Sequence, residues 1–303
     1  MPTAQQGRRT SEESFLVGLI GTGIGPSLSP ALHQREAEEL GVRLIYRRLD
    51  LAELAVAPAD VGEVLAAARL TGYDGLNVTH PCKQLVLPHL DELSEDAVAL
   101  GAVNTIVFRD GRASGHNTDW SGFARSFDRG LPDAPLNRVV LLGAGGAGSA
   151  VAHAMLTLGT DRLSVVDLDP GRACALARSL EERFGAGRAQ GFGLTALPTE
   201  MPRADGLVHA TPTGMADHPG LPLPGELLRR DLWVADIVYR PLETELVRAA
   251  RALGSRVLDG GGMAVFQAVD SFRCFTGLDP DPERMLAHFA DLARGQDRDV
   301  AVG

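Results

Sequence analysis

A glycine-rich segment after an apolar run is the feature that most limits how this chain can fold. The run VVLL at 139–142 leads into Gly143, Ala144, Gly145, Gly146, Ala147 and Gly148, and a helix-like stretch follows over 150–158. Gly143, Gly145 and Gly148 match G-x-G-x-x-G between a strand and a helix, where a tight turn presents free backbone N–H groups to a pyrophosphate. The segment predicts a dinucleotide-binding βαβ unit, with all these loop residues as cofactor-binding candidates; the alternative is a glycine-rich turn in an ordinary α/β domain.

An acidic residue closes the next predicted strand. Asp167 ends the run SVVD, about 20 residues after Gly148, as the dinucleotide pattern requires. A carboxylate there accepts hydrogen bonds from the hydroxyls of an adenosine ribose and repels a 2′-phosphate. Asp167, with Asp169 beside it, therefore favours NAD over NADP, and Arg172 is interpreted as a surface charge on the following helix.

Short apolar runs alternate with amphipathic stretches along the whole chain, which is typical of parallel sheets covered by helices. The expected strands are 16–20, 44–49, 75–78, 103–108 and 112–115 in the first half, and 138–142, 163–167, 206–210, 232–237 and 256–258 in the second. A break near 120–137 separates the halves. The pattern predicts an α/β fold with two α/β domains, one over 14–119 and a dinucleotide-binding one over 120–262.

The composition limits the partners. The 303 residues include 39 acidic and 29 basic side chains, a formal charge of −10, which disfavours nucleic acid and anionic membranes. The apolar run at 15–20 is far shorter than the ~18 residues of a membrane span, and no signal-peptide pattern surrounds it. Cys82, Cys174 and Cys274 offer neither a disulfide framework nor a metal site. We expect a cytoplasmic monomer or homodimer with small-molecule ligands and no metal.

Two serines precede a predicted helix in the first half. Ser29 is expected as the N-cap of a helix over 31–40, with Pro30 at its first position and Gly41 after its end. Hydroxyls at a helix N-terminus also form a small carboxylate site, because their donors and the helix dipole both favour an anion. Ser27 and Ser29 are thus either a loop serine and a cap, or an anion site.

Polar side chains mark the end of the strand at 75–78. Asn77 and Thr79 share one face because side chains alternate along a strand, and Pro81 ends it. Lys83 lies just beyond, where open α/β sheets bind ligands. Lysine is most often a solvated surface residue, but Lys83 is the only lysine of the chain, which favours a need for a titratable amine there.

Two further polar clusters are Asn104 with Thr105, and the run Asn117-Thr118-Asp119 at the junction of the halves. Asp119 is read either as a helix N-cap or as a site residue beside a cleft between the domains.

Together these motifs resemble the shikimate/quinate dehydrogenase family from Leu16 to about Phe289. The matching segments are SLSP at 27–30, NVTHP at 77–81 with Lys83, GAVNT at 101–105, NTD at 117–119, the glycine loop, ATP at 210–212 with GM at 214–215, DIVY at 236–239, and GGGM at 260–263 with Gln267. The resemblance implies an N-terminal substrate domain and a C-terminal Rossmann-type NAD domain around a cleft, with the last helices, 263–296, packing back onto the first. It implies reversible oxidation of the C3 hydroxyl of quinate or shikimate, with hydride passing to a nicotinamide.

The resemblance also implies roles for single residues. Lys83 and Asp119 match the catalytic pair, which takes up the hydroxyl proton as hydride departs. Ser27 and Ser29 match the ligands of the substrate carboxylate, and the ring hydroxyls are assigned to Asn77, Thr79, Asn104, Asp119 and Gln267. Tyr239 and Gly260 match residues near substrate and nicotinamide, while Thr211, Gly262 and Met263 fall in segments assigned to the cofactor.

The details are most similar to the NAD-using quinate/shikimate branch. Where NADP-using members carry an Asn-Arg-Thr-like patch, this chain has DLD at 167–169, and His80, His116 and YRRLD at 46–50 also resemble that branch. His209 replaces a common asparagine and Cys82 a common aromatic residue, and the sequence explains neither. Two alternatives stay open: a dehydrogenase for an amino-substituted analogue, and a non-catalytic NAD-responsive regulator, which would be free to lose Lys83 or Asp119.

Overall fold

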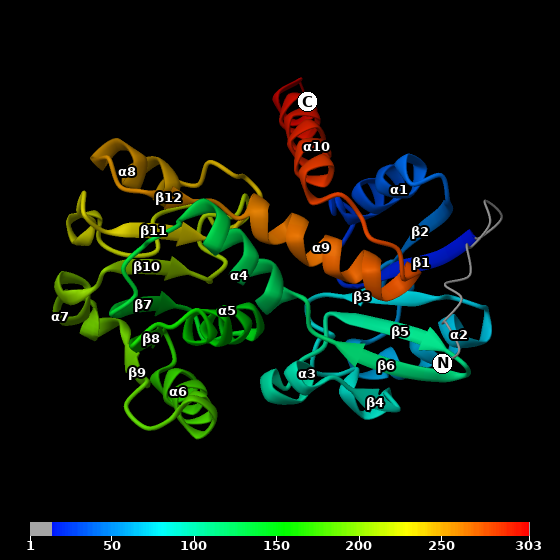
Figure 1. Cartoon of the computed structure of the whole chain (residues 1–303), viewed down its shortest axis with the longest axis horizontal. Helices are drawn as coiled ribbons and strands as arrows, with labels where there is room; N and C mark the ends of the chain where they lie inside the picture. Colours follow the sequence, from blue (N-terminus) through cyan, green and yellow to red (C-terminus); the bar gives the residue numbers. More distant parts are fainter. Residues whose placement is uncertain (1–13, 303) are drawn as a thin grey trace, which may run out of the picture. The chain divides into compact units, whose positions relative to one another are not determined.

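The computed structural model of the chain describes residues 14–302, with the backbone alone from residue 296. These residues divide into two compact units, one formed by 14–117 with 268–302 and the other by 118–267. Each unit contains one six-stranded sheet flanked by helices (Figure 1). The α/β class predicted from the sequence is confirmed.

The sheet of the first unit is mixed. Its strands are β1 (Ser14–Gly21), β2 (Arg43–Asp50), β3 (Gly75–Val78), β4 (Glu92–Leu93), β5 (Thr105–Arg109) and β6 (Arg112–His116), in the order β2-β1-β3-β5-β6-β4. β1 pairs in parallel with β2 and β3, whereas β5 is antiparallel to β3 and β6. The carboxyl ends of β1, β2 and β3 and the start of β5 therefore meet at one edge of the sheet.

Helices bury both faces of this sheet. They are α1 (Ser29–Glu39), α2 (Val61–Leu70), α3 (Glu95–Leu100) and the second part of α9 (Gly261–Thr276), with short 3-10 turns at Pro58–Asp60 and Leu87–His89. The last helix, α10 (Pro282–Val302), packs against α1. One apolar cluster joins Val61 and Leu65 of α2 to Leu76 of β3. A second joins Phe272 and Phe275 of α9 to Val17 of β1 and Tyr46 of β2. Because side chains alternate along each strand, the two clusters lie on opposite faces.

The sheet of the second unit is parallel throughout. Its strands are β7 (Arg138–Leu142), β8 (Arg162–Asp167), β9 (Ala189–Gly193), β10 (Gly206–His209), β11 (Trp233–Asp236) and β12 (Val257–Leu258), in the order β12-β11-β10-β7-β8-β9. Counted from β7, this is the doubly wound Rossmann order 3-2-1-4-5-6 read from the other edge. From β7 the chain adds β8 and β9 on one side and then β10, β11 and β12 on the other. The order therefore reverses between β7 and β10, which is the switch point where such sheets bind ligands.

The helices of the second unit are α4 (Asp119–Gly130), α5 (Gly146–Thr157), α6 (Pro170–Phe184), α7 (Leu197–Glu200), α8 (Glu245–Leu253) and the first part of α9, with 3-10 turns at Leu194–Ala196, Met201–Arg203 and Gly225–Leu227. No helix in the described part of the chain has both the length and the apolar character needed to cross a membrane.

Three elements differ from the sequence expectation. The break expected near 120–137 contains α4, whose Phe123 and Phe127 lie one helical turn apart and are buried in the core of the unit. β9 and β4 were not predicted, because AQGFG at 189–193 has no apolar alternation and β4 has two residues. Both are edge strands that exist through pairing with β8 and β6.

Candidate functional site

The glycine loop lies between β7 and α5, at the switch point of the second sheet. Gly143 has φ +101°, and a Cβ there would lie 2.5 Å from the Ala210 carbonyl oxygen; a Cβ on Gly148 would lie 2.0 Å from the Gly143 oxygen. A Cβ on Gly145 would meet no other described atom within 4 Å. The loop is thus packed against β10 on one side and open at the start of α5, a cradle that fits a pyrophosphate.

Asp167 closes β8 and supports this loop. Its Oδ2 accepts a hydrogen bond from the Ala144 amide at 2.7 Å, and its Oδ1 accepts one from the Asp169 amide at 2.9 Å. Asp169 is the N-cap of α6, and its Oδ1 accepts from the amides of Gly171 and Arg172. Both carboxylates therefore have structural roles that the sequence did not reveal. Because carboxylate oxygens have further lone pairs, Asp167 can still accept a hydrogen bond from a ribose hydroxyl.

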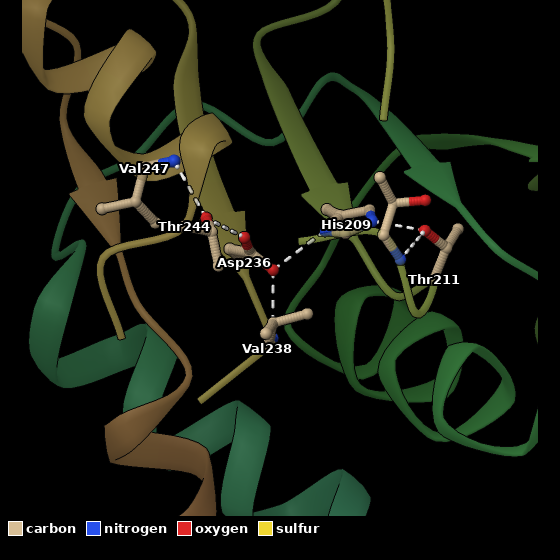
Figure 2. Close-up of polar contacts among 7 residues, drawn as sticks. His209, Thr211, Asp236, Val238, Thr244 and Val247 are labelled. Carbon is tan, nitrogen blue, oxygen red and sulfur yellow. Dashed lines mark hydrogen bonds and ion pairs between the residues drawn. The ribbon is translucent and has the colours of Figure 1, made fainter. Parts of the chain in front are cut away.

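A buried chain of hydrogen bonds joins the carboxyl ends of β10 and β11 (Figure 2). Nδ1 of His209 lies 2.9 Å from Oδ1 of Asp236, and Nε2 of His209 lies 2.5 Å from Oγ1 of Thr211. Oδ2 of Asp236 accepts from the Thr244 hydroxyl at 2.6 Å, and Oδ1 accepts from the Val238 amide at 3.0 Å. His209, which the sequence could not explain, is thus part of a network that reaches the segment assigned to the cofactor.

The other residues expected at the site in the second unit have more varied surroundings. Tyr239 is 37 % exposed. A Cβ on Gly260 would lie 2.5 Å from the Ile237 carbonyl oxygen, so this turn is packed against the end of β11. Met263 belongs to the core of the unit. The side-chain amide of Gln267 donates through Nε2 to the Ala264 carbonyl of its own helix at 3.0 Å.

Asp119 is buried and is the first residue of α4. The N-cap of that helix is Thr118, and no side chain caps it, so the reading of Asp119 as an N-cap is wrong. The helix begins one residue earlier than that reading required, so Asp119 lies inside its first turn.

The serine pair lies in the loop from β1 to α1. Ser29 is the first residue of the helix, its N-cap is Leu28, and no side-chain cap is made; the N-cap predicted at Ser29 is wrong. The Ser27 hydroxyl oxygen accepts from the Ser29 amide at 3.3 Å, which satisfies a donor of the first turn from outside the helix. Both serines are half-buried.

Asn77 and its neighbours form a hydrogen-bonded group at the edge where β3 ends. Oδ1 of Asn77 accepts from the Tyr46 hydroxyl at 2.8 Å. Nδ2 of Asn77 donates to Thr105 Oγ1 at 3.2 Å and to the Asn104 carbonyl at 3.3 Å. The structure therefore brings Asn77 together with Asn104 and Thr105, and Tyr46 joins the group.

Thr79 and Lys83 continue along the same edge. The Thr79 amide donates to the Ile20 carbonyl at 2.9 Å, and the Val103 amide donates to the Lys83 carbonyl at 2.8 Å. Both residues are half-buried, so Lys83 differs from a fully solvated surface lysine. Burial raises the pKa of the Cys82 thiol beside it, which disfavours the thiolate.

Strand β2 supports the serine loop, a contribution that was missed from sequence. Asp50 accepts from the Ile24 amide at 2.8 Å and from the Gly23 amide at 3.2 Å, and Arg48 donates to the Ser27 carbonyl at 3.1 Å. Tyr46, Arg48 and Asp50 occupy alternate positions, so they share one face of the strand. That period of two was the available signal.

Among the residues that the structure describes, no group of three or more His, Cys, Asp or Glu side chains is arranged to hold a metal ion.

Known proteins are similar to nearly the whole chain. A family model described as "Shikimate dehydrogenase substrate binding domain" matches residues 19–106. The chain is 65% identical to a "Shikimate dehydrogenase (NADP(+))" of Streptomyces avermitilis, over 93% of this chain and 97% of the relative. It is 50% identical to a "Quinate/shikimate dehydrogenase (NAD(+))" of Corynebacterium efficiens, over 93% of this chain and 100% of the relative.

A solved structure has the same architecture. The quinate dehydrogenase of Corynebacterium glutamicum in complex with NAD superposes with a TM-score of 0.87 at 48% identity, covering 92% of this chain and 99% of that one. The relatives thus agree on the reaction class and differ in the cofactor named.

Proposed function

Because this chain belongs to the shikimate dehydrogenase family and is an oxidoreductase of the shikimate/quinate type, we propose that it oxidises the C3 hydroxyl of quinate and of shikimate reversibly with NAD. The proposal assigns the substrate to the unit of 14–117 with 268–302 and the cofactor to the unit of 118–267. We further propose a cytoplasmic enzyme, monomeric or homodimeric, with small-molecule ligands alone.

The observation that carries the choice of NAD is the position of two carboxylates beside the glycine loop. Asp167 contacts the loop at Ala144, and Asp169 begins the next helix. A 2′-phosphate at the ribose would approach two negative charges, whereas a 2′-hydroxyl would find acceptors. The glycine loop would hold the pyrophosphate through the amides at the start of α5.

The substrate assignment is supported by the polar edge of the first sheet. Ser27 and Ser29 lie at the start of α1, where hydroxyl donors and the helix dipole favour a carboxylate. Asn77 and Asn104 are joined at the same edge and would bind ring hydroxyls. These groups match a ring that carries one carboxylate and several hydroxyls.

The catalytic assignment concerns Lys83 and Asp119. A bound nicotinamide accepts the hydride that the C3 carbon loses. The hydroxyl proton must leave in the same conversion, and Lys83, as a neutral amine, would accept or relay it. Asp119 would orient the hydroxyl and stabilise the protonated lysine. In the reverse direction Lys83 returns the proton to the C3 oxygen.

Steady-state kinetics of the purified protein test the proposal. We expect turnover of both quinate and shikimate, and a higher kcat/KM with NAD than with NADP. Robust shikimate turnover without quinate turnover would remove quinate from the proposal, and an equal or higher kcat/KM with NADP would overturn the cofactor choice, in line with the Streptomyces relative. Exclusive turnover of an amino-substituted analogue would replace the substrate, and inactivity despite cofactor binding would favour a regulator.

A further inference from the structure

The buried pair of His209 and Asp236 has no part in the proton and hydride transfers just described. Both residues are essentially excluded from solvent, at 0% and 2% exposure. We propose that His209 is a positioning residue for the cofactor: held by Asp236, it fixes the hydroxyl of Thr211 and with it the segment 210–215. The inference rests on the proposed function, since it treats that segment as part of the cofactor site.

The partners of His209 define where its protons lie. A carboxylate oxygen only accepts, so the short contact to Asp236 requires a hydrogen on Nδ1 of His209. Nε2 lies 2.5 Å from Thr211 Oγ1, and in a neutral ring it accepts from the Thr211 hydroxyl. In either protonation state the ring holds the Thr211 oxygen in place, towards the buried end of β10.

Asp236 holds the ring from the opposite side. It also accepts from the Val238 amide and from the hydroxyl of Thr244. Thr244 is the N-cap of α8, where its oxygen accepts from the Val247 amide. The series of hydrogen bonds in Figure 2 therefore ends at the N-terminus of α8. His209 cannot turn without leaving a buried polar group unpaired.

The segment that His209 holds starts beside the glycine loop. The Ala210 amide donates to the Leu142 carbonyl at 2.7 Å, and the Ala210 carbonyl lies against Gly143. Beyond it, Thr211 Oγ1 accepts from the Thr213 amide at 3.3 Å. Loss of the His209 contact would free Thr211 next to the pyrophosphate cradle, so cofactor affinity should fall while the chemical step is retained.

A double-mutant cycle with NAD as the probe tests this inference in the full-length protein. His209→Ala and Thr211→Val are expected to raise the Kd of NAD, measured by calorimetry, about tenfold each, the effect of losing roughly one hydrogen bond. The double variant should be no more than about twofold weaker than either single variant, because coupled residues are not additive. For His209→Ala we expect kcat at saturating NAD to stay within about threefold, the pattern of lost uniform binding.

Two conservative variants separate positioning from folding. The amide of His209→Gln reaches the place of Nε2 and should restore NAD affinity. His209→Asn keeps a donor for Asp236 but is too short to reach Thr211, so its affinity for NAD should remain low. It replaces His209→Ala in the cycle if the alanine variant does not fold. Additive losses in the cycle, equal affinity of the Gln and Asn variants, or unchanged Kd values would each overturn the inference while leaving the proposed function intact. Absence of nucleotide binding by the wild type would overturn both.

Discussion

The hydroxyl of Tyr46 in β2 donates a 2.8 Å hydrogen bond to Oδ1 of Asn77 in β3, with both side chains buried. The two strands are separated by β1 in the sheet. Because its oxygen is engaged by Tyr46, the amide of Asn77 is turned so that Nδ2 faces Thr105 and the Asn104 carbonyl. A residue outside the polar motif thus orients a candidate substrate ligand.

Tyr46→Phe should weaken substrate binding without affecting the cofactor. The change leaves Oδ1 of Asn77 without its buried donor, which costs about 1–3 kcal/mol of folding stability, and it lets the amide turn. We expect a higher KM for shikimate, an unchanged Kd for NAD and a lower midpoint of urea unfolding. Tyr73→Phe, in the turn after α2 of the same unit, is the matched control; an equal KM effect there would contradict the role of Tyr46.

Lys83→Ala should lower kcat by ~10²–10⁴, the usual contribution of a positioned acid–base group, with little change in NAD affinity. Lys83→Arg keeps a positive charge but has no amine that can lose its proton near neutral pH. It should therefore be nearly as slow as Lys83→Ala. Recovery of kcat by arginine would show that Lys83 acts through charge alone, and a raised KM with intact kcat would make it a binding residue.

Asp119→Asn should lower kcat more than it raises KM for the substrate. Asparagine retains hydrogen-bonding groups but lacks the negative charge that would stabilise a protonated lysine. The comparison requires steady-state kinetics together with circular dichroism, because Asp119 is buried at the start of α4. Equal changes in Asp119→Asn and Asp119→Ala would argue against a role for the charge.

Asp167→Asn should narrow the preference for NAD over NADP and keep one of the two backbone contacts of this side chain. Its side-chain oxygen can still accept from the amide of Ala144 or of Asp169, whereas Asp167→Ala removes both oxygens to which these amides donate. The charge-assisted hydrogen bond to the ribose is worth about 1.5–3 kcal/mol. The ratio of kcat/KM with NAD to kcat/KM with NADP is therefore expected to fall by roughly tenfold or more. Asp169→Asn is the companion variant, and an unchanged ratio in both would remove the carboxylates from cofactor choice.

Acid should destabilise the first unit through His33. Burial lowers the pKa of His33 from 6.5 to about 4, because the ring is enclosed by aromatic residues and Ser29 offsets the effect only in part. The unfolded chain binds the proton more readily than the folded one. The contribution of the neutral His33 ring to folding stability is therefore complete above pH 6.5 and is lost as the pH falls towards 4. The loss amounts to about 3 kcal/mol.

Urea unfolding of the wild type and of His33→Gln between pH 7 and pH 4 checks this expectation. The unfolding free energy of the wild type minus that of His33→Gln should fall by about 3 kcal/mol between pH 7 and pH 4. A constant difference would mean that His33 does not account for the pH dependence.

The glycine loop and Asp167 show how far local sequence reaches. Their spacing and the apolar runs beside them predicted the strand–turn–helix unit, because tight turns and helix starts impose residue types on neighbouring positions. The same local pattern could not show that the Asp167 carboxylate would bond to Ala144. That contact depends on β7 and β8 being adjacent in the sheet.

The sequence by itself determined the α/β class, the Rossmann-type fingerprint and the chemical character of the polar edge, since each is encoded in periodicity or in short motifs. Tertiary structure decided the rest. Tyr46 reaches Asn77 across an intervening strand, and β9 exists through its pairing with β8. His209 gains its role from Asp236, which lies on the neighbouring strand. Such partners are distant in the chain, and a buried polar group acquires its function from the neighbours that satisfy its hydrogen bonds.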